Sequence, residues 1–379
     1  MTLVLTEEQQ MLRDSAAGFL AGKAGPAQLR ALRDSDDELA FDPAVWREMA
    51  GMGWASIAIP EAYGGLGYGY TGLGVVLEQV GRHLSPSPLE ASVLIGATAV
   101  HRLGGETQRQ EWLPRIAAGE AQVSLAVQES AQFDPTGIAL RAERDGDDWV
   151  LTGDKRMVLD ALSADAFVVI ARSASAPGST DGMSAFLVPA GSDGLHVTRC
   201  DLVDSRQCGA LRLDGLRLPA AALMGEAGGV WPRLEECLDI AAIGLASELL
   251  GLATEAFERT MAYLRERKQF GRVIGSFQGL QHRAAALFAE LELARSIVLR
   301  ALQAVDADAA DLPVLASAAK AKLCEVAKTA SNEGIQMHGG IGMTDEYDIG
   351  FYLKRARVLQ HLMGDYYYHL DRFARLGGY

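Results

Sequence analysis

Two stretches in the last third of the chain decide its interpretation: Arg267-Lys268-Gln269-Phe270-Gly271, followed by Gln278, and Gln336-Met337-His338-Gly339-Gly340-Ile341-Gly342. Glycines let a backbone come close to a pyrophosphate and offer it N–H donors. Taken alone, the first stretch is better explained as a solvated basic helix end, and the second as a C-cap turn. Brought together from two helices, the two stretches would grip the phosphates and adenine of a dinucleotide.

The composition indicates a globular protein with more than one folded unit. The chain has 379 residues, of which 49% are hydrophobic and 22% are charged, and this length is enough for two or three sizeable cores. The net charge of −14 argues against non-specific binding to nucleic acid or to an anionic membrane surface. We therefore expect no nucleic-acid partner and no membrane partner.

The cysteines and histidines give no sign of a metal site. Cys200, Cys208, Cys237 and Cys324 are scattered without a CxxC pair, and the seven histidines lack metal-ligand spacing. This pattern favours a reducing cytoplasm. The first residues contain early acids and no basic segment, so we expect no signal peptide. The longest apolar run, residues 240–252, is too short to span a bilayer and predicts a buried helix.

The periodicity of apolar residues predicts an α+β chain with three parts. Residues 1–120 have mainly helical spacing and begin with a capping-box pattern at Thr6 and Gln9. Residues 121–227 contain short apolar runs separated by Gly, Asp and Ser, which is typical of a small antiparallel β domain. Residues 228–379 return to long helical stripes, which predict a helical bundle at the C-terminal end.

One glycine motif points toward a different fold. Gly67-Tyr68-Gly69-Tyr70-Thr71-Gly72 matches GxGxxG and lies between a strand-like run at residues 54–60 and a helical pattern. A nicotinamide site would need a βαβ unit around this motif. A second helical pattern follows instead of a parallel strand, so we interpret the motif as a surface loop after a turn.

In combination, the motifs of this chain resemble those of the acyl-CoA dehydrogenases, in order and with matching spacing from about residue 5 to residue 376. The resemblance implies an N-terminal helical domain, a middle antiparallel β domain and a C-terminal four-helix bundle. The motifs that carry it are Glu61-Ala62-Tyr63-Gly64-Gly65-Leu66-Gly67, Arg267-x-x-Phe270-Gly271 with Gln278, Gln336-x-x-Gly339-Gly340, and Glu346-Tyr347.

The function implied by this resemblance is FAD-dependent α,β-dehydrogenation of an acyl-CoA thioester. In this family a carboxylate removes the α-proton, a hydride leaves the β-carbon for the flavin, and hydrogen bonds stabilise the charge on the thioester oxygen. Family members hold the adenine and pyrophosphate end of a neighbouring subunit's FAD through two elements of the C-terminal bundle. The matching residues here are Arg267, Phe270, Gln278, Gln336, Gly339 and Gly340.

The chain departs from the family at both positions where the catalytic base is usually found. Met363 occupies the position near the C-terminus, and Ala241 occupies the position in the first bundle helix. Neither side chain can accept a proton. Glu248, seven residues after Ala241, is a possible displaced base about 10 Å along the same helix face, although a buried polar contact explains it better. Asp365 and Asp239 are weaker candidates, and Asp365 is expected to point elsewhere on a helix.

The loops expected to face the flavin depart as well. The family's Thr-Glu-Pro matches Gln128-Glu129-Ser130, and the usual glycines and serines after it are replaced at residues 131–135. The Trp-Ile-Thr that lies against the isoalloxazine matches Met157-Val158-Leu159. These changes remove a flat aromatic wall and hydroxyl hydrogen bonds. The half-site given to a neighbour is therefore intact, while the chain's own half-site is eroded.

Four hypotheses follow from this asymmetry. The first is a cytoplasmic companion subunit that lacks the base and completes the FAD site of an unlike acyl-CoA dehydrogenase subunit in an α2β2 tetramer. Electron-transfer flavoprotein is then a candidate acceptor, and fatty or steroid-derived acyl-CoA a candidate substrate. The second is a homotetrameric dehydrogenase with a displaced base such as Glu248. The third is a non-catalytic acyl-CoA-binding protein, and the fourth is a related flavin oxidase or monooxygenase.

Overall fold

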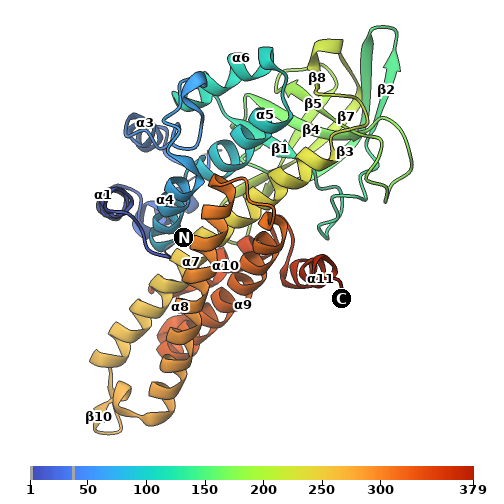
Figure 1. Cartoon of the computed structure of the whole chain (residues 1–379). Coiled ribbons are helices and arrows are strands. Elements are labelled where there is room, and N and C mark those ends of the chain that lie inside the picture. Colours follow the sequence, from blue (N-terminus) through green and yellow to red (C-terminus); the bar gives the residue numbers. More distant parts are fainter. Residues whose placement is uncertain (1–2, 36–38) are drawn as a thin grey trace. The chain divides into compact units, whose positions relative to one another are not determined.

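The structure, a computed structural model, describes residues 3–35 and 39–379. Helices come first, then a β-sheet, then long helices, as predicted (Figure 1). Contacts divide the chain into two compact units. One unit contains Met1–Asp34, Tyr70–Pro86 and Ala242–Tyr379, and the other contains Ser35–Gly69 and Ser87–Ala241.

The sheet lies in the second unit and is mixed. Its strands are β1 (Val123–Ala126), β2 (Arg141–Asp145), β3 (Asp148–Leu159), β4 (Ala166–Arg172), β5 (Met183–Pro189), β6 (Leu195–Asp201), β7 (Gln207–Leu218) and β8 (Leu223–Met224). The strand order is β6-β7-β3-β2-β4-β5-β8, and β1 also pairs with β4. Most neighbours are antiparallel, but β1 and β2 each run parallel to β4.

These two parallel pairs correct the prediction of a purely antiparallel domain. Every residue of β1 and of β4 is buried, and strands buried on both faces read as continuous apolar runs instead of alternating ones. Short runs of this kind do not reveal strand direction, because periodicity reports which faces are buried and not which neighbour pairs.

The helices of the second unit are short. They are α3 (Pro43–Gly51), η1 (Glu61–Tyr63), η2 (Leu89–Gly96), α5 (Ala97–Leu103), α6 (Glu106–Ala117) and η3 (Ala220–Ala222). The strand-like run at residues 54–60 forms turns, not a strand. The glycine loop folds back on it, with Leu66 N donating to Ser56 O at 2.9 Å. A Cβ at Gly65 would lie 1.8 Å from Ile59 O, so only glycine fits this crossing.

The GxGxxG motif runs from this turn into a helix. Gly67 and Gly69 have φ values of +58° and +90°, a backbone region that favours glycine. Helix α4 (Gly69–His83) begins inside the motif, and residues 39–68 contain no strand before it. The rejection of a dinucleotide fold agrees with this geometry. The expected surface loop is correct only for Gly67 and Tyr68, because residues 69–72 form the first turn of α4 and Thr71 and Gly72 are buried.

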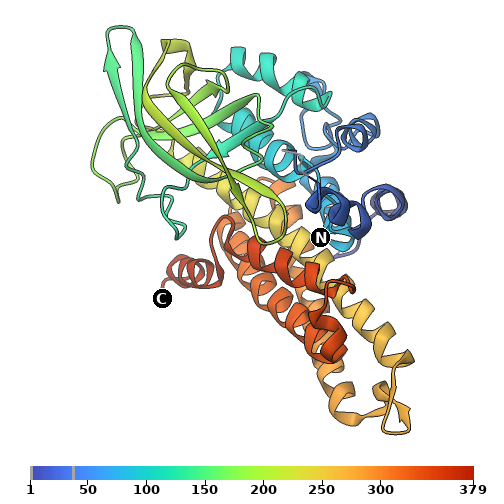
Figure 2. The same cartoon turned by 180° about the vertical axis from the view of Figure 1, so that it is seen from behind.

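The first unit is helical. Its members are α1 (Glu7–Lys23), α2 (Pro26–Arg33), α4 from Tyr70 onward, most of α7 (Trp231–Glu266), α8 (Gln278–Asp306), α9 (Leu312–His338), η5 (Gly339–Met343), α10 (Ile349–His361) and α11 (Tyr366–Leu376). Helix α9 packs against α8, α10 and α11, and α7 runs beside them, as Figure 2 shows from behind. The predicted capping box is present: Gln9 N donates to Thr6 Oγ1 at 3.2 Å, and Thr6 N donates to Gln9 Oε1 at 3.0 Å.

Helix α7 is the buried helix predicted for residues 240–252. Among the described residues it is the one helix long and apolar enough to cross a membrane, and its apolar window is wholly buried inside the protein. It meets α4 backbone to backbone. A Cβ at Gly251 would lie 1.8 Å from Glu78 O, and one at Gly81 would lie 2.0 Å from Glu248 O. Glycine at both positions therefore sets the distance between the two helices.

We expect Gly251→Ala to destabilise the protein, because the added methyl group would overlap the Glu78 carbonyl and force α4 and α7 apart. Overpacking of this kind costs about 1–3 kcal/mol, which urea unfolding would detect. Gly18→Ala in α1 is the matched control, since its Cβ would meet nothing within 4 Å and alanine favours a helix by about 1 kcal/mol. Equal stability of the two variants would contradict the close approach.

Candidate functional site

The first predicted stretch forms a hairpin between α7 and α8. Helix α7 ends at Glu266, and strands β9 (Lys268–Gln269) and β10 (Arg272–Val273) pair antiparallel. Phe270 and Gly271, at the turn, both have positive φ values, +53° and +75°, the conformation of the tightest β-hairpins. The basic segment is therefore a hairpin at the far end of the α7–α8 pair (Figure 1), not a helix end.

The second predicted stretch ends α9 and continues into the 3₁₀ turn η5. Gly339 has φ +63°, which closes the helix, as a C-cap turn does. His338 is 3% exposed, its Nδ1 lies 2.6 Å from Gly334 O, and burial lowers its pKa. A neutral, buried His338 thus anchors the glycine turn that follows it.

Aromatic contacts bring the two stretches together. The Tyr263 ring, four residues before Arg267 on α7, stacks on the His338 ring with centroids 4.5 Å apart. Tyr347 lies against the other two rings, at 6.3 Å from Tyr263 and 4.8 Å from His338. Tyr263 was not identified from the sequence. Its position one helical turn before Arg267 is the feature of the sequence that could have identified it.

The side chains predicted to hold a nucleotide are free for a ligand. Within the described residues, no hydrogen bond or ion pair engages the side chains of Arg267, Gln278 and Gln336. Phe270 is 90% exposed at the hairpin tip. A Cβ at Gly339 or Gly340 would meet no atom within 4 Å, so the backbone there is open. A cation, amides, a ring and an open glycine backbone suit an FAD phosphate and adenine end.

The C-terminal base position lies in a tight loop between α10 and α11. Met363 and Gly364 have φ values of +54° and +95°, and Met363 is 8% exposed. Such a backbone at a non-glycine residue persists only when its surroundings enforce it. Asp365 caps α11 by accepting a hydrogen bond from Tyr368 N at 2.9 Å. The expectation that Asp365 lies within a helix is therefore corrected: it lies just before one.

Buried polar groups hold this loop in place. Lys320, 0% exposed, donates to Gly364 O at 2.8 Å and to Gln360 O at 3.4 Å, and burial lowers its pKa. The Nε2 of His369 donates to Met363 O at 2.8 Å. The loop thus keeps a defined shape although Met363, at the base position, cannot accept a proton.

The other base position is also apolar. Ala241 is fully buried in α7, and Asp239 is 3% exposed. Glu248 is 0% exposed, and its Oε1 accepts a hydrogen bond from Arg355 Nε at 2.7 Å. The guanidinium is itself 4% exposed. This geometry is that of a buried ion pair inside the bundle, which favours the structural explanation of Glu248 over a displaced base.

The loop after β1 is pinned by its own acid. The Glu129 carboxylate accepts hydrogen bonds from Lys155 Nζ at 2.7 Å, from Ala139 N at 2.7 Å and from Leu140 N at 3.1 Å. Lys155 is fully buried, and burial lowers its pKa to about 8 against the opposing effect of Glu129. Glu129 therefore fixes the backbone of residues 139–140 and is not a spare proton acceptor.

The position predicted to lie against the flavin ring holds a methionine, Met157. Met157 lies at an irregularity of β3, between register pairs Lys155↔Leu211 and Val158↔Gly209, with φ +53°. Its Sδ is 3.8 Å from Cys208 Sγ. The bulge turns one side chain out of the strand alternation, as a wall residue requires, but a flexible thioether replaces the flat ring.

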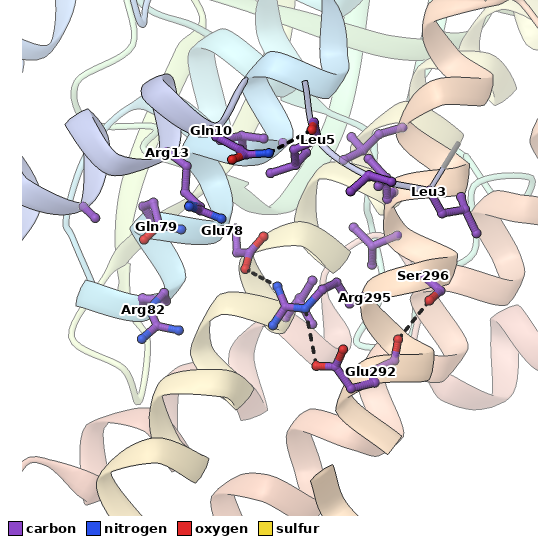
Figure 3. Close-up of a pocket in the computed structure, with 18 residues that line it drawn as sticks. Leu3, Leu5, Gln10, Arg13, Glu78, Gln79, Arg82, Glu292, Arg295 and Ser296 are labelled. Carbon is purple, nitrogen blue, oxygen red and sulfur yellow. Dashed lines mark hydrogen bonds and ion pairs between the residues drawn. The ribbon is translucent and has the colours of Figure 1, made fainter. Parts of the chain in front are cut away.

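A separate pocket of about 640 Å³ lies in the first unit, bounded by residues 3–5, α1, α4 and α8. Figure 3 shows Arg295 bonded to both Glu78, at 2.9 Å, and Glu292, at 3.7 Å. None of the predicted nucleotide-binding or base positions lines it. The described part of the chain has no group of three or more His, Cys, Asp or Glu side chains that could hold a metal ion.

We expect Glu248→Ala to lower the free energy of unfolding by about 3–5 kcal/mol, because it leaves a buried guanidinium without this carboxylate. Replacing both partners, Glu248→Met with Arg355→Met, should recover most of the loss. Glu292→Ala, at an exposed pair, is the control and should change stability by at most about 0.5 kcal/mol. Chemical denaturation measures all three, and a silent Glu248→Ala would rule out a structural ion pair.

Stability should also depend on pH through His369. Burial, with Lys320 as the second cause, lowers its pKa to about 3. A depressed folded-state pKa means that neutral His369 contributes stability above about pH 6.5, which is lost as pH falls toward 3. The advantage of wild type over His369→Gln should therefore shrink between pH 7 and pH 4, by at most about 1.4 kcal/mol per pH unit. Urea unfolding at each pH measures this difference. Parallel curves for wild type and His369→Gln over this pH range would contradict the prediction.

Comparison with known proteins agrees with this geometry. The chain matches the acyl-CoA dehydrogenase N-terminal domain over residues 6–120, the middle domain over residues 127–215 and the C-terminal domain over residues 229–376. The probable acyl-CoA dehydrogenase YngJ of Bacillus subtilis is 32% identical over 368 residues and covers 95% of each chain.

Solved structures are similar over nearly the whole length. The steroid ACAD Tcur3481-Tcur3483 has a TM-score of 0.88 and 32% identity, covering 98% of each chain. The ChsE4-ChsE5 complex of Mycobacterium tuberculosis has a TM-score of 0.90 and 26% identity, covering 100% of this chain and 99% of that one. Three matching domains in the expected order, with these relatives, show that the chain belongs to the acyl-CoA dehydrogenase family, whose members bind FAD.

Proposed function

We propose that this chain is the companion subunit of an unlike acyl-CoA dehydrogenase and that it completes its partner's FAD site without supplying a base. One asymmetry supports this role. The elements that would serve a neighbour, including the Arg267 and Gln336 side chains, are exposed and unengaged. The positions that would serve this chain's own chemistry hold Met363, Ala241 and Met157, and none of these can move a proton or form a flat wall.

Each exposed group has a physical task in this proposal. The Arg267 guanidinium would pair with a pyrophosphate oxygen, and the Phe270 ring would lie against the adenine. The open backbone at Gly339 and Gly340 would let the phosphates approach closely. FAD, when bound, would accept the hydride from the substrate. The aromatic contact of Tyr263 with His338 holds the two elements at a fixed spacing.

The proposed assembly is a cytoplasmic α2β2 tetramer acting on an acyl-CoA thioester, with electron-transfer flavoprotein as the candidate acceptor. The likeness to the ChsE4-ChsE5 complex supports an unlike partner. The likeness to a steroid ACAD makes a bulky acyl group the first class to test. A homotetramer using Glu248 would have to break a buried ion pair with Arg355, and this cost weighs against it.

A flavin count tests the proposal. The chain purified alone should be colourless, and the complex with its unlike subunit should be yellow, with two FAD for every four chains. The absorbance spectrum of the released flavin, divided by protein concentration, measures this ratio. Full occupancy of the chain alone would favour a homotetramer. A colourless protein in every pairing that still binds acyl-CoA would favour a non-catalytic binding role.

A matched pair of variants locates the contribution of the hairpin. Arg267→Ala should weaken FAD retention by the complex, because it removes a cation from the pyrophosphate. Arg265→Ala is the control: it lies two residues earlier and is also exposed, but it is not among the residues predicted to bind FAD. Equal FAD retention by both variants would remove the hairpin from the flavin site.

A further inference from the structure

Two of the four cysteines lie directly opposite each other in the sheet. Strands β6 and β7 pair antiparallel, and Cys200 is the register partner of Cys208. Residues directly opposed in an antiparallel pair have Cα atoms about 4.5–5.5 Å apart, and their side chains lie on the same face. A disulfide needs Cα atoms about 4.4–6.8 Å apart, so this pair meets the distance requirement without backbone movement.

The two cysteines are opposite each other on neighbouring strands, and only Cys200 faces solvent. Cys208 is fully buried, and its Sγ donates to Cys200 O at 3.5 Å, while the Cys200 Sγ donates to Thr198 O at 3.9 Å. Cys200 is partly exposed. A small oxidant from solvent can therefore reach Cys200 first, with Cys208 opposite it on the neighbouring strand.

The hairpin that joins the strands fixes this register. Leu202 N donates to Arg206 O at 3.1 Å. Arg206 is 8% exposed, lies 3.6 Å from the Glu90 carboxylate and donates to Ser87 O at 3.4 Å. An arginine buried in this way resists a shift of the hairpin, because a shift would separate its charge from that carboxylate.

We propose that Cys200 and Cys208 form a redox-active dithiol that a small disulfide such as glutathione disulfide converts to an intramolecular disulfide. The Cys200 thiolate attacks one glutathione sulfur, and the glutathione S–S bond breaks to release one glutathione thiolate. The Cys208 thiolate then attacks the Cys200 sulfur and displaces the second. Two protein thiols are oxidised, one glutathione disulfide is reduced, and the two protons from the protein thiols pass through solvent to the two glutathione thiolates, which become thiols. This proposal rests on the hairpin alone and not on the companion-subunit role.

The second step should be slow and pH-dependent. Burial raises the pKa of Cys208 to about 12, and the Cys200 side chain and the carboxylates of Asp204 and Asp160 raise it further. Since the thiolate is the nucleophile, ring closure should accelerate about tenfold per pH unit from pH 7 to pH 9. At the lower pH, glutathione bound to Cys200 should accumulate before the ring closes.

The sequence makes the product easy to identify. Trypsin cuts after Arg199, Arg206 and Arg212, which places Cys200 on peptide 200–206 and Cys208 on peptide 207–212. The full chain is incubated with glutathione disulfide, quenched with an alkylating agent and digested without reduction. We expect the two peptides joined, two hydrogens lighter than their sum and separated by dithiothreitol. Cys237 and Cys324, both buried, serve as internal controls that stay reduced.

Two variants separate the steps. Cys208→Ser should stop at a stable glutathione adduct on Cys200. Cys200→Ser should leave Cys208 reduced, because the exposed thiol is gone. The proposal is overturned if wild-type protein at pH 9 ends with glutathione on Cys200 and no joined peptides, or if all four thiols remain free. Since the wild-type result decides between these outcomes, the test does not depend on either variant folding.

Discussion

The constraint on which the loops of this protein depend is that a buried cation must be satisfied by nearby oxygens. Burying an unpaired charge is far more costly than any single hydrogen bond returns. Lys155, Lys320 and Arg355 are each at most 4% exposed. Lys155 holds Glu129, Lys320 holds the carbonyl of Gly364, and Arg355 holds Glu248. Three internal charges thereby fix two loops and one helix contact.

This constraint explains how the scaffold persists without its reactive groups. The loop that carries Met363 is shaped by bonds from Lys320 and His369 to backbone carbonyls, and these bonds do not depend on the identity of residue 363. In the same way, Glu129 fixes the backbone at residues 139–140 whatever wall residue lies on β3. Loss of the base and loss of the aromatic wall are therefore compatible with an intact fold.

Local structural features were predicted well from the sequence, because the residues that form them are close together in the chain. The capping box joins Thr6 and Gln9, which are three positions apart, and the apolar run at residues 240–252 is a continuous part of helix α7. The strand-like run at residues 54–60 does not form a strand, because the glycine loop that crosses it donates hydrogen bonds to its backbone carbonyls. The periodicity of apolar residues does not reveal these hydrogen bonds. Asp365 was misplaced because α10 ends at His361 and the extended Leu362 and two positive-φ residues, Met363 and Gly364, form a loop before it.

The sequence by itself determined the fold family, the order of helices and sheet, and the residue types at the base and flavin positions, since these are read from composition, spacing and motifs. Only the tertiary structure decided which buried groups meet. Glu248 and Arg355 are 107 residues apart in the chain, and Tyr263 reaches His338 across two helices. The parallel pairing of β1 with β4 is of the same kind. Such pairings depend on where distant segments pack, and the local pattern of a chain does not encode that position.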